Sequence, residues 1–351
     1  MQKLFHTEKT LIGLEINTAD IKVMAVDEVH QEVVGYGVLD VDGKQMKKAL
    51  EEDPTYLTAC LTKLLTESVI GELPGDDYVV SLPTARTYAR TFTVPSSSEK
   101  NLREAVELEV SQYVPIPASL LSIDYEIIER DKDTITVTMA AVPRIMIDNI
   151  LQACDGVNIS VHAIEPGINS VARLVKATED GSLTTLIVDI SQSQTDIAVL
   201  DGGTIRVTGG ISTGGHSFTL AIAKQLGVTL ENAHQLKVLN GLNPGPRQKK
   251  ITDALEPNFK QIASEIRRVI RYYDERISTG VKVEQVLIVG GGSNVPGIGE
   301  YFTNELIMPA RVASPWQSIN FGSLEQPTKQ FRPRYISVAG LASLTGKEIW
   351  Q

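Results

Sequence analysis

Residues 11–23 read LIGLEINTADIKV: an apolar strand that ends near Glu15, a turn of small and polar residues, and a returning strand. Residues 186–200 repeat this order as LIVDISQSQTDIAVL, with Asp189 near the end of the first strand. Two copies of one supersecondary unit, roughly 175 residues apart, predict a duplicated α/β architecture of two lobes. Two turns of this kind could hold a chain of phosphates between them, so nucleotide binding is the first functional hypothesis.

Composition and net charge exclude several classes of function. The chain has 351 residues, 42% of them hydrophobic, which is enough for two lobes with proper cores. Its net charge of −10 argues against a nucleic-acid partner and against broad adsorption to an anionic membrane. Two cysteines form neither a disulfide framework nor a metal cluster. Without a signal peptide or an apolar run that spans a bilayer, we expect a cytoplasmic protein with no direct membrane insertion.

A third motif, VLIVGGGSNVPG, occupies residues 286–297. An apolar strand runs directly into Gly290, Gly291 and Gly292, where the absence of side chains lets the backbone approach a flat ligand closely. A glycine-rich turn without a ligand is the alternative interpretation. The motif is neither a dinucleotide fingerprint nor a P-loop, because no Gly-Lys-Ser/Thr follows.

The segment 82–142 lies between elements of the first half and is predicted to be an inserted subdomain. Its helix is expected over Asn101–Tyr113, with Ser98 as N-cap, and prolines end it. We therefore predict a first lobe over 1–180 that contains this insertion. A second lobe is expected over 181–351, with a C-terminal helix over 335–345 that returns to the first lobe.

The two turns and the G-G-G-x-x-x-P-G motif, in this order, resemble the actin-like ATPase superfamily of actin, sugar kinases and Hsp70. Its fold is a two-lobed, duplicated RNase H-like α/β fold that binds nucleotide. Within it, the chain is similar to the type IV pilus assembly protein PilM family, a relative of the division protein FtsA. The run LREAVELEVSQYVPIP at 102–117 carries this resemblance, together with AAVPR at 140–144, EP at 165–166, AHQLK at 233–237 and EIRRV at 265–269.

The resemblance implies that the chain binds ATP and Mg²⁺. In the first lobe it implies a phosphate turn made by Asn17, Thr18, Ala19 and Asp20, with Lys22 neutralising phosphate charge. In the second lobe it implies a phosphate turn made by Ser191, Gln192, Ser193, Gln194 and Thr195, covered by Gly214 and Gly215. Gly290, Gly291, Gly292 and Asn294 would line the adenine, and Glu265 and Arg268 would reach the ribose and base. Glu15 and Asp189 would hold Mg²⁺ through water, and Glu165 would orient the attacking water.

Several of these residues also have simpler interpretations. Lys22, taken alone, is typical of a solvated lysine on a strand. Glu165 could charge the N-terminus of the helix that follows it. Glu265 and Arg268 are three residues apart and could form a surface ion pair.

Two departures from the family pattern predict slow hydrolysis. The first turn has Glu15 and Asn17 where Asp-x-Gly is usual, and Ser191 replaces the glycine of the second turn. A Cβ at these places can crowd a phosphate, and the longer Glu15 moves its carboxylate by more than ~1 Å. We therefore expect at most a slow ATPase.

The resemblance implies an ATP-binding assembly protein of a type IV pilus platform, recruited to the inner face of the cytoplasmic membrane. It would bind the short cytoplasmic N-terminal peptide of a bitopic, PilN-like partner in a groove beside the 82–142 region. The pilus ATPase, other platform proteins and a second copy of the chain are further candidate partners. The alternatives are an FtsA-like division protein and a small-molecule kinase, which would need an acid as general base beside its acceptor.

Overall fold

The computed structural model describes residues 10–27, 30–84, 87–179, 181–278, 280–314 and 319–344. The chain divides into two units, which we describe separately. The first contains the described residues of Met1–Pro83, Asp148–Glu179 and Ser314–Gln351. The second contains those of Thr84–Ile147 and Asp180–Ala313.

The first unit is built on a six-stranded mixed sheet with the strand order β4-β3-β2-β1-β5-β9. β1, β2 and β3 pair antiparallel, whereas β5 runs parallel to β1 and β9 parallel to β5. Every residue of β1 is buried, which explains its continuous apolar run. The strands are β1 (Ile12–Ile16), β2 (Asp20–Asp27), β3 (Glu32–Asp40), β4 (Val69–Gly71), β5 (Asp77–Leu82) and β9 (Ser160–Pro166).

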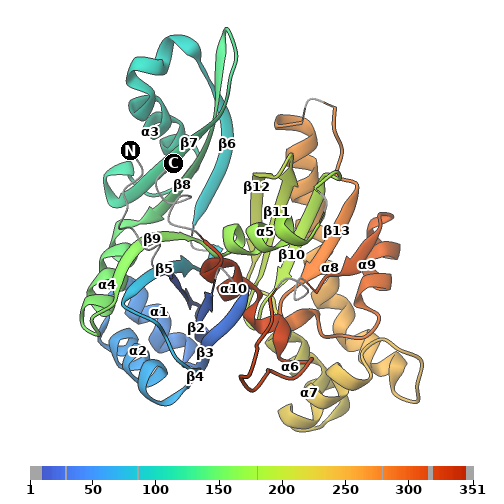
Figure 1. Ribbon diagram of the computed structural model, residues 1–351. Helices are drawn as coiled ribbons and strands as arrows, with labels where there is room; N and C mark the ends of the chain where they lie inside the picture. The colour runs from blue at the N-terminus through green and yellow to red at the C-terminus, as the bar shows by residue number, and fades with distance from the viewer. Residues whose placement is uncertain are drawn as a thin grey trace. The chain divides into compact units, whose positions relative to one another are not determined.

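Helices pack on this sheet, and the last of them comes from the far end of the chain. They include α1 (Gly43–Glu51), α2 (Thr55–Glu67), α5 (Gly167–Thr178) and α10 (Ile336–Ala342), which follows the 3-10 turn η5 (Arg332–Tyr335). In Figure 1, α10 is the dark red helix beside the blue strands of the sheet. It contacts β1 and α5 closely, because a Cβ at Gly340 would overlap the backbone of Ser170.

The second unit contains an eight-stranded sheet with the order β14-β13-β10-β11-β12-β6-β8-β7. β10, β11 and β12 pair antiparallel and β13 runs parallel to β10, as β5 does beside β1. This shared arrangement confirms the predicted duplication. The strands are β6 (Tyr88–Pro95), β7 (Leu121–Arg130), β8 (Thr134–Pro143), β10 (Thr185–Ile190), β11 (Thr195–Asp201), β12 (Thr204–Ile211), β13 (Gln285–Val289) and β14 (Ala310–Val312).

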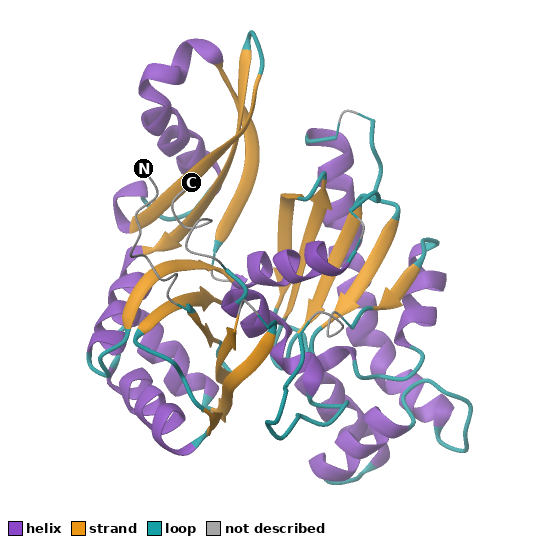
Figure 2. Cartoon of the chain, in the orientation of Figure 1, coloured by secondary structure: helices purple, strands orange, loops and turns teal. Residues whose placement is uncertain are grey.

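The inserted segment contributes β6, β7 and β8 with helix α3 (Leu102–Tyr113) beside them, as Figure 2 shows. Val106 and Val110 of α3 pack in one apolar cluster with Val137 and Met139 of β8. The prediction of Ser98 as N-cap is wrong. The chain already turns as a 3-10 helix, η2 (Ser96–Asn101), so α3 begins only after Asn101.

The remaining helices of the second unit cover its sheet and complete its core. α8 packs on β11, β12 and α6, with Phe218, Phe259, Ile262 and Ile266 in one buried cluster. None of the helices in the described ranges is both long and apolar enough to cross a membrane. These elements are α6 (Gly215–Leu226), α7 (Leu230–Leu239), α8 (Gln248–Arg276), α9 (Ile298–Leu306) and the 3-10 turn η4 (Gly291–Ser293). The 3-10 turn η3 (Ala118–Leu120) lies in the inserted segment, and α4 (Arg144–Asp155) belongs mostly to the first unit, where Asn149 donates to the Leu50 carbonyl oxygen at 3.1 Å.

Candidate functional site

The turn between β10 and β11 is closed by its own hydrogen bonds. Both the backbone N–H and the hydroxyl of Ser191 donate to the Gln194 carbonyl oxygen, at 2.9 and 3.0 Å. The Gln194 amide donates to Asp196 Oδ2 at 2.8 Å, and the Thr195 hydroxyl to the Thr213 carbonyl oxygen at 2.7 Å. The turn is therefore held rigidly before any ligand binds.

The start of α6 packs directly on this turn. The N–H groups of Gly215 and His216 donate to the carbonyl oxygens of Ser191 and Gln192, at 2.9 and 2.8 Å. A Cβ on Gly214 would lie 2.7 Å from the Ser191 carbonyl oxygen, so only glycine fits this approach.

The triglycine turn reaches the same place from β13. A Cβ on Gly292 would overlap the Ile190 side chain and approach the Ser191 carbonyl oxygen to 3.1 Å. Gly290 has φ +85, and a Cβ there would overlap the Asp189 carboxylate. The structure thus brings three of the predicted segments in the second unit together around Ser191. Gly291, Ser193 and Asn294 are half-buried and Gln192 is exposed.

Lys237 belongs to this group of residues, although sequence reasoning gave it no role. Its ammonium group donates to the Gly215 carbonyl oxygen at 2.9 Å and to the Thr219 hydroxyl at 3.0 Å. Burial lowers the pKa of Lys237 to about 8, because the charged form loses its hydration. The only signal in the sequence is the family-like run AHQLK at 233–237, which by itself implies no role for its lysine.

The turn between β1 and β2, in the first unit, is surrounded by charged side chains that bond one another. The Asn17 N–H donates to the Asp20 carbonyl oxygen at 2.9 Å, which closes the turn. Lys22 is buried, and its ammonium group donates to Glu15 Oε2 at 3.1 Å and to Asp20 Oδ1 at 2.8 Å. The Asn17 amide donates to the other Glu15 oxygen at 2.5 Å. Thr18 and Ala19, at the tip, are half-buried.

Arg334 extends this cluster from the C-terminal segment. It donates to Asp20 Oδ2 at 3.0 Å and to Asp40 Oδ1 at 2.6 Å. Burial alone would raise the pKa of Asp20, but Lys22 and Arg334 outweigh it and the pKa is lowered. At Glu15, burial is the stronger effect and raises the pKa. Lys22 is thus held between two carboxylates.

Glu165, at the end of β9, forms a two-point ion pair. Arg173 of α5 donates to its two carboxylate oxygens at 3.0 and 2.8 Å, and also to the Gly340 carbonyl oxygen of α10 at 2.8 Å. This arrangement ties β9, α5 and α10 together.

Glu265 and Arg268 lie on α8, opposite β12. Glu265 accepts from the Gly210 N–H at 3.2 Å and from Arg268 Nε at 2.8 Å. Their contacts therefore include both the simple ion pair that the spacing suggests and a hydrogen bond to the backbone near the end of β12.

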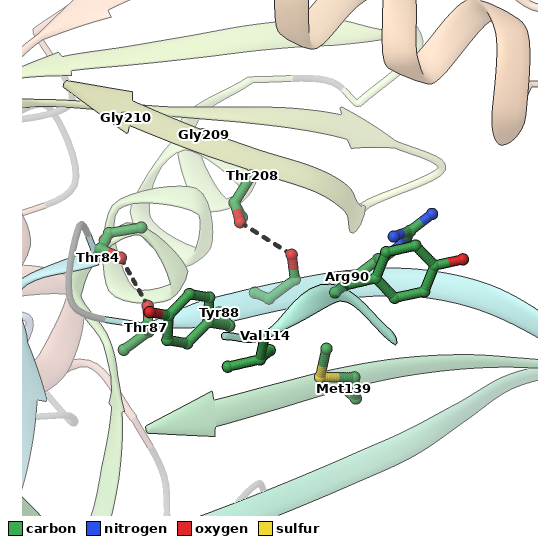
Figure 3. Close-up of a pocket in the computed structure, with 11 residues that line it drawn as sticks. Thr84, Thr87, Tyr88, Arg90, Val114, Met139, Thr208, Gly209 and Gly210 are labelled. Atoms are coloured by element: carbon green, nitrogen blue, oxygen red, sulfur yellow. Dashed lines mark hydrogen bonds between the residues drawn. The ribbon is translucent and has the colours of Figure 1, made fainter. Parts of the chain in front are cut away.

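A cavity of about 260 Å³ opens where the inserted segment meets β12. Figure 3 shows Thr208, Gly209 and Gly210 of β12 above it, with Tyr88, Val114 and Met139 on its other side. Thr84, Thr87, Ala89, Arg90 and Tyr113 also line it. Its walls mix apolar side chains with hydroxyl and backbone groups, as is typical of ligand and peptide pockets.

Comparisons with known proteins agree with this architecture. In a solved structure described as a PilM-PilN type IV pilus biogenesis complex, one chain matches with a TM-score of 0.78 and 20% identity, covering 95% of this chain and 97% of that one. The ethanolamine utilization protein EutJ from Carboxydothermus hydrogenoformans matches with a TM-score of 0.53 and 17% identity, over 95% and 89%. These likenesses show the actin-like, two-lobed fold that the sequence predicts.

Sequence comparison gives related results. Cell division protein FtsA of Escherichia coli (strain K12) is 23% identical, over 97% of this chain and 91% of its own length. EutJ of the same strain is 28% identical over 46% of this chain, and the match spans 50% of that relative's length. The family profile described as type IV pilus assembly protein PilM matches residues 13–345. The chain therefore belongs to the type IV pilus assembly protein PilM family.

Proposed function

We propose that this chain is an ATP-binding assembly protein of a type IV pilus platform. The observation that carries the nucleotide part is the convergence of two glycine-bearing segments, Gly214-Gly215 and Gly290–Gly292, on the Ser191 turn, beside the buried ammonium group of Lys237. Among the described residues, only neutral oxygens bond this ammonium group, so an anion would complement it.

The proposed ligands of ATP are those that the resemblance implies, with Lys237 added. In the second unit they are the Ser191–Thr195 turn, Gly214, Gly215, Glu265, Arg268, Gly290–Gly292 and Asn294. In the first unit they are Asn17–Asp20 and Lys22. Glu15 and Asp189 are the proposed carboxylates for Mg²⁺ held through water; each Glu15 oxygen accepts one hydrogen bond and keeps a further lone pair. Bound Mg²⁺ would offset phosphate charge.

Hydrogen exchange with and without Mg-ATP tests this assignment, because it reports on each unit separately. We expect slower exchange in 17–22, in 191–195 and in 290–294. Protection in only one of the two units would contradict the proposal that both turns contact the nucleotide. Unchanged exchange throughout would contradict ATP binding itself.

We further propose that the chain binds the cytoplasmic N-terminal peptide of a PilN-like membrane protein and is recruited to the membrane by it. The family and the likeness to a chain of a PilM-PilN complex support this partner. The cavity of Figure 3 is our candidate for part of the peptide groove. It lies at the 82–142 segment, and Tyr88, Val114 and Met139 could receive an apolar side chain.

A pull-down from solubilised membranes with tagged protein and Mg-ATP, analysed by mass spectrometry, tests the partner. Recovery of a single-span protein with a short cytoplasmic N-terminus would support the proposal. A tubulin-like partner would favour an FtsA-like role instead. No partner, together with rapid ATP consumption on adding small metabolites, would favour a kinase.

A matched pair of variants tests the groove. Thr87→Trp places a bulky ring at the rim of the cavity, whereas Thr93→Trp places the same ring on the exposed part of β6 away from it. We expect the first variant to lose partner recovery and the second to keep it. Equal recovery with both would exclude this cavity from the peptide groove.

A further inference from the structure

A second, smaller cavity in the second unit is surrounded by arginines. It has a volume of about 140 Å³, several times the ~30 Å³ of one water molecule in the liquid. Arg90 of β6, Arg206 of β12 and Arg268 of α8 all line it, with Tyr272 of α8 beside them. Three guanidinium groups around one cavity are unexpected in a chain whose net charge is −10.

Arg90 is held in place by rings rather than by carboxylates. Its guanidinium carbon lies 3.4 Å from the centre of the Tyr113 ring and 5.2 Å from that of Tyr272. Figure 3 shows this guanidinium group against a tyrosine ring at the edge of the neighbouring cavity. Its Nε is buried and has no hydrogen-bond partner among the residues that the structure describes. A buried donor of this kind is costly, and calls for an acceptor.

The other two arginines are only partly neutralised. Arg206 Nε is also buried and forms no hydrogen bond within the described part of the chain; Asp201 Oδ2 lies 3.8 Å away, beyond bonding distance. That Asp201 oxygen already accepts from the Tyr273 hydroxyl at 2.8 Å. Arg268 is paired with Glu265. Among the described residues, three guanidinium groups therefore face two carboxylates, which leaves an excess of positive charge.

We propose that this cavity is an anion site for the phosphate group of a small molecule, held by Arg90, Arg206 and Arg268. Phosphate fits better than a carboxylate because it has more acceptor oxygens and carries up to two charges, and three arginines line the cavity. The site shares Arg268 with the proposed nucleotide ligands but contains none of the glycine segments around Ser191, so Arg90 and Arg206 distinguish it from the nucleotide site.

Its position gives the proposed ligand a structural effect. β6 and β12 are joined at a single registered pair, Arg90 with Val207. A phosphate held by Arg90 on one strand and Arg206 on the other would strengthen this connection. The ligand would thereby couple the inserted segment to the rest of the second sheet.

Arginine-selective ¹⁵N NMR of the full chain, titrated with inorganic phosphate at constant ionic strength set by chloride, tests the site. We expect the Nε–H signals of Arg90 and Arg206 to shift and saturate. Sodium acetate in the same series should have a much weaker effect. The readout is local, so phosphate bound at the glycine segments would not imitate it.

Variants make the test decisive. Arg206→Gln should weaken the phosphate affinity at Arg90 at least about tenfold, since a charge-assisted hydrogen bond is lost. Arg90→Lys keeps the positive charge but loses the planar guanidinium group with its several donors. It should therefore weaken the phosphate affinity measured at Arg206. The control Arg103→Gln removes an exposed arginine of α3 and should change nothing. Shifts that do not saturate, that acetate reproduces, or that survive both variants would overturn the proposal.

Discussion

The three glycines after β13 differ in how well they would tolerate an added side chain. Gly290 has positive φ and lies against Asp189, and Gly292 lies against Ile190, so neither accepts a side chain. Gly291, between them, is half-buried. It is therefore the position at which ligand binding can be blocked with least damage to the fold.

We predict that Gly291→Leu abolishes ATP binding while the unfolding temperature stays near that of the wild type. The leucine side chain would occupy the surface that we propose for the adenine. Calorimetric titration and thermal unfolding measure the two effects. Gly245→Leu is the matched control, because Gly245 lies in an exposed loop without close neighbours. Wild-type ATP affinity in Gly291→Leu would mean that the triglycine segment is only a turn.

Lys237 predicts a pH dependence of stability. Its pKa is lowered to about 8 in the folded chain, against about 10.4 for an exposed lysine. Between these pH values the unfolded chain binds more protons, so the free energy of unfolding should rise with pH. The rise attributable to Lys237 is at most about 3 kcal/mol, since one pKa unit corresponds to about 1.4 kcal/mol.

Denaturant unfolding between pH 7 and 10.5 measures this slope. Lys237→Met should lack the part that Lys237 contributes, whereas Lys224→Met, on the exposed face of α6, should keep it. Parallel curves for the wild type and Lys237→Met would contradict a buried, destabilised ammonium group.

At the scale of elements, the ion cluster around Asp20 connects segments that are distant in the sequence. Arg334 of η5 bonds Asp20 of β2 and Asp40 of β3. Removing one partner of a buried ion pair leaves the other charge uncompensated, which typically costs 3–5 kcal/mol. The cluster thus fastens the C-terminal segment to the first sheet.

We predict that Arg334→Gln lowers the free energy of unfolding by about 3 kcal/mol at pH 7. In the wild type, the pKa of the Asp20 carboxyl is lowered. The contribution of Asp20 to the free energy of unfolding is therefore present above its pKa in the unfolded chain, and it is lost as the pH falls through its pKa in the folded chain. Without Arg334 the pKa of Asp20 should rise, and acid unfolding should begin at higher pH.

Urea unfolding from pH 3 to 7 is the measurement. The control is Lys48→Gln, which removes one partner of an exposed pair with Glu52 and should cost less than about 1 kcal/mol. Equal losses in the two variants would show that the buried cluster contributes no more than a surface pair.

At the scale of the whole molecule, we predict that Mg-ATP raises the unfolding temperature and is hydrolysed slowly. A ligand at 100 times its dissociation constant stabilises the folded state by about 2.7 kcal/mol. Slow hydrolysis is expected because Glu15 and Asn17 depart from the usual first turn and Glu165 is held by Arg173. Calorimetry and a phosphate-release assay measure the two effects. Rapid turnover would contradict a scaffold or switch.

Much of the fold could be predicted because its signals are local. β1 and β10 are buried on both faces, so each appears as a continuous apolar run, and glycines mark the turns that follow β12 and β13. α1 was not predicted, because only Met46, Ala49 and Leu50 of its nine residues are buried. The role of Lys237 could not be predicted, since nothing local shows that a lysine is buried.

The duplicated strand–turn–strand units, the glycine turns and the family follow from patterns that are local in the sequence. Folding establishes which charges meet: Lys22 with Glu15 and Asp20, and Arg334 with Asp20. It also establishes that three arginines from β6, β12 and α8 surround one cavity. Hydrophobic periodicity acts between neighbours in the sequence, whereas burial and ion pairing depend on groups that only folding brings together.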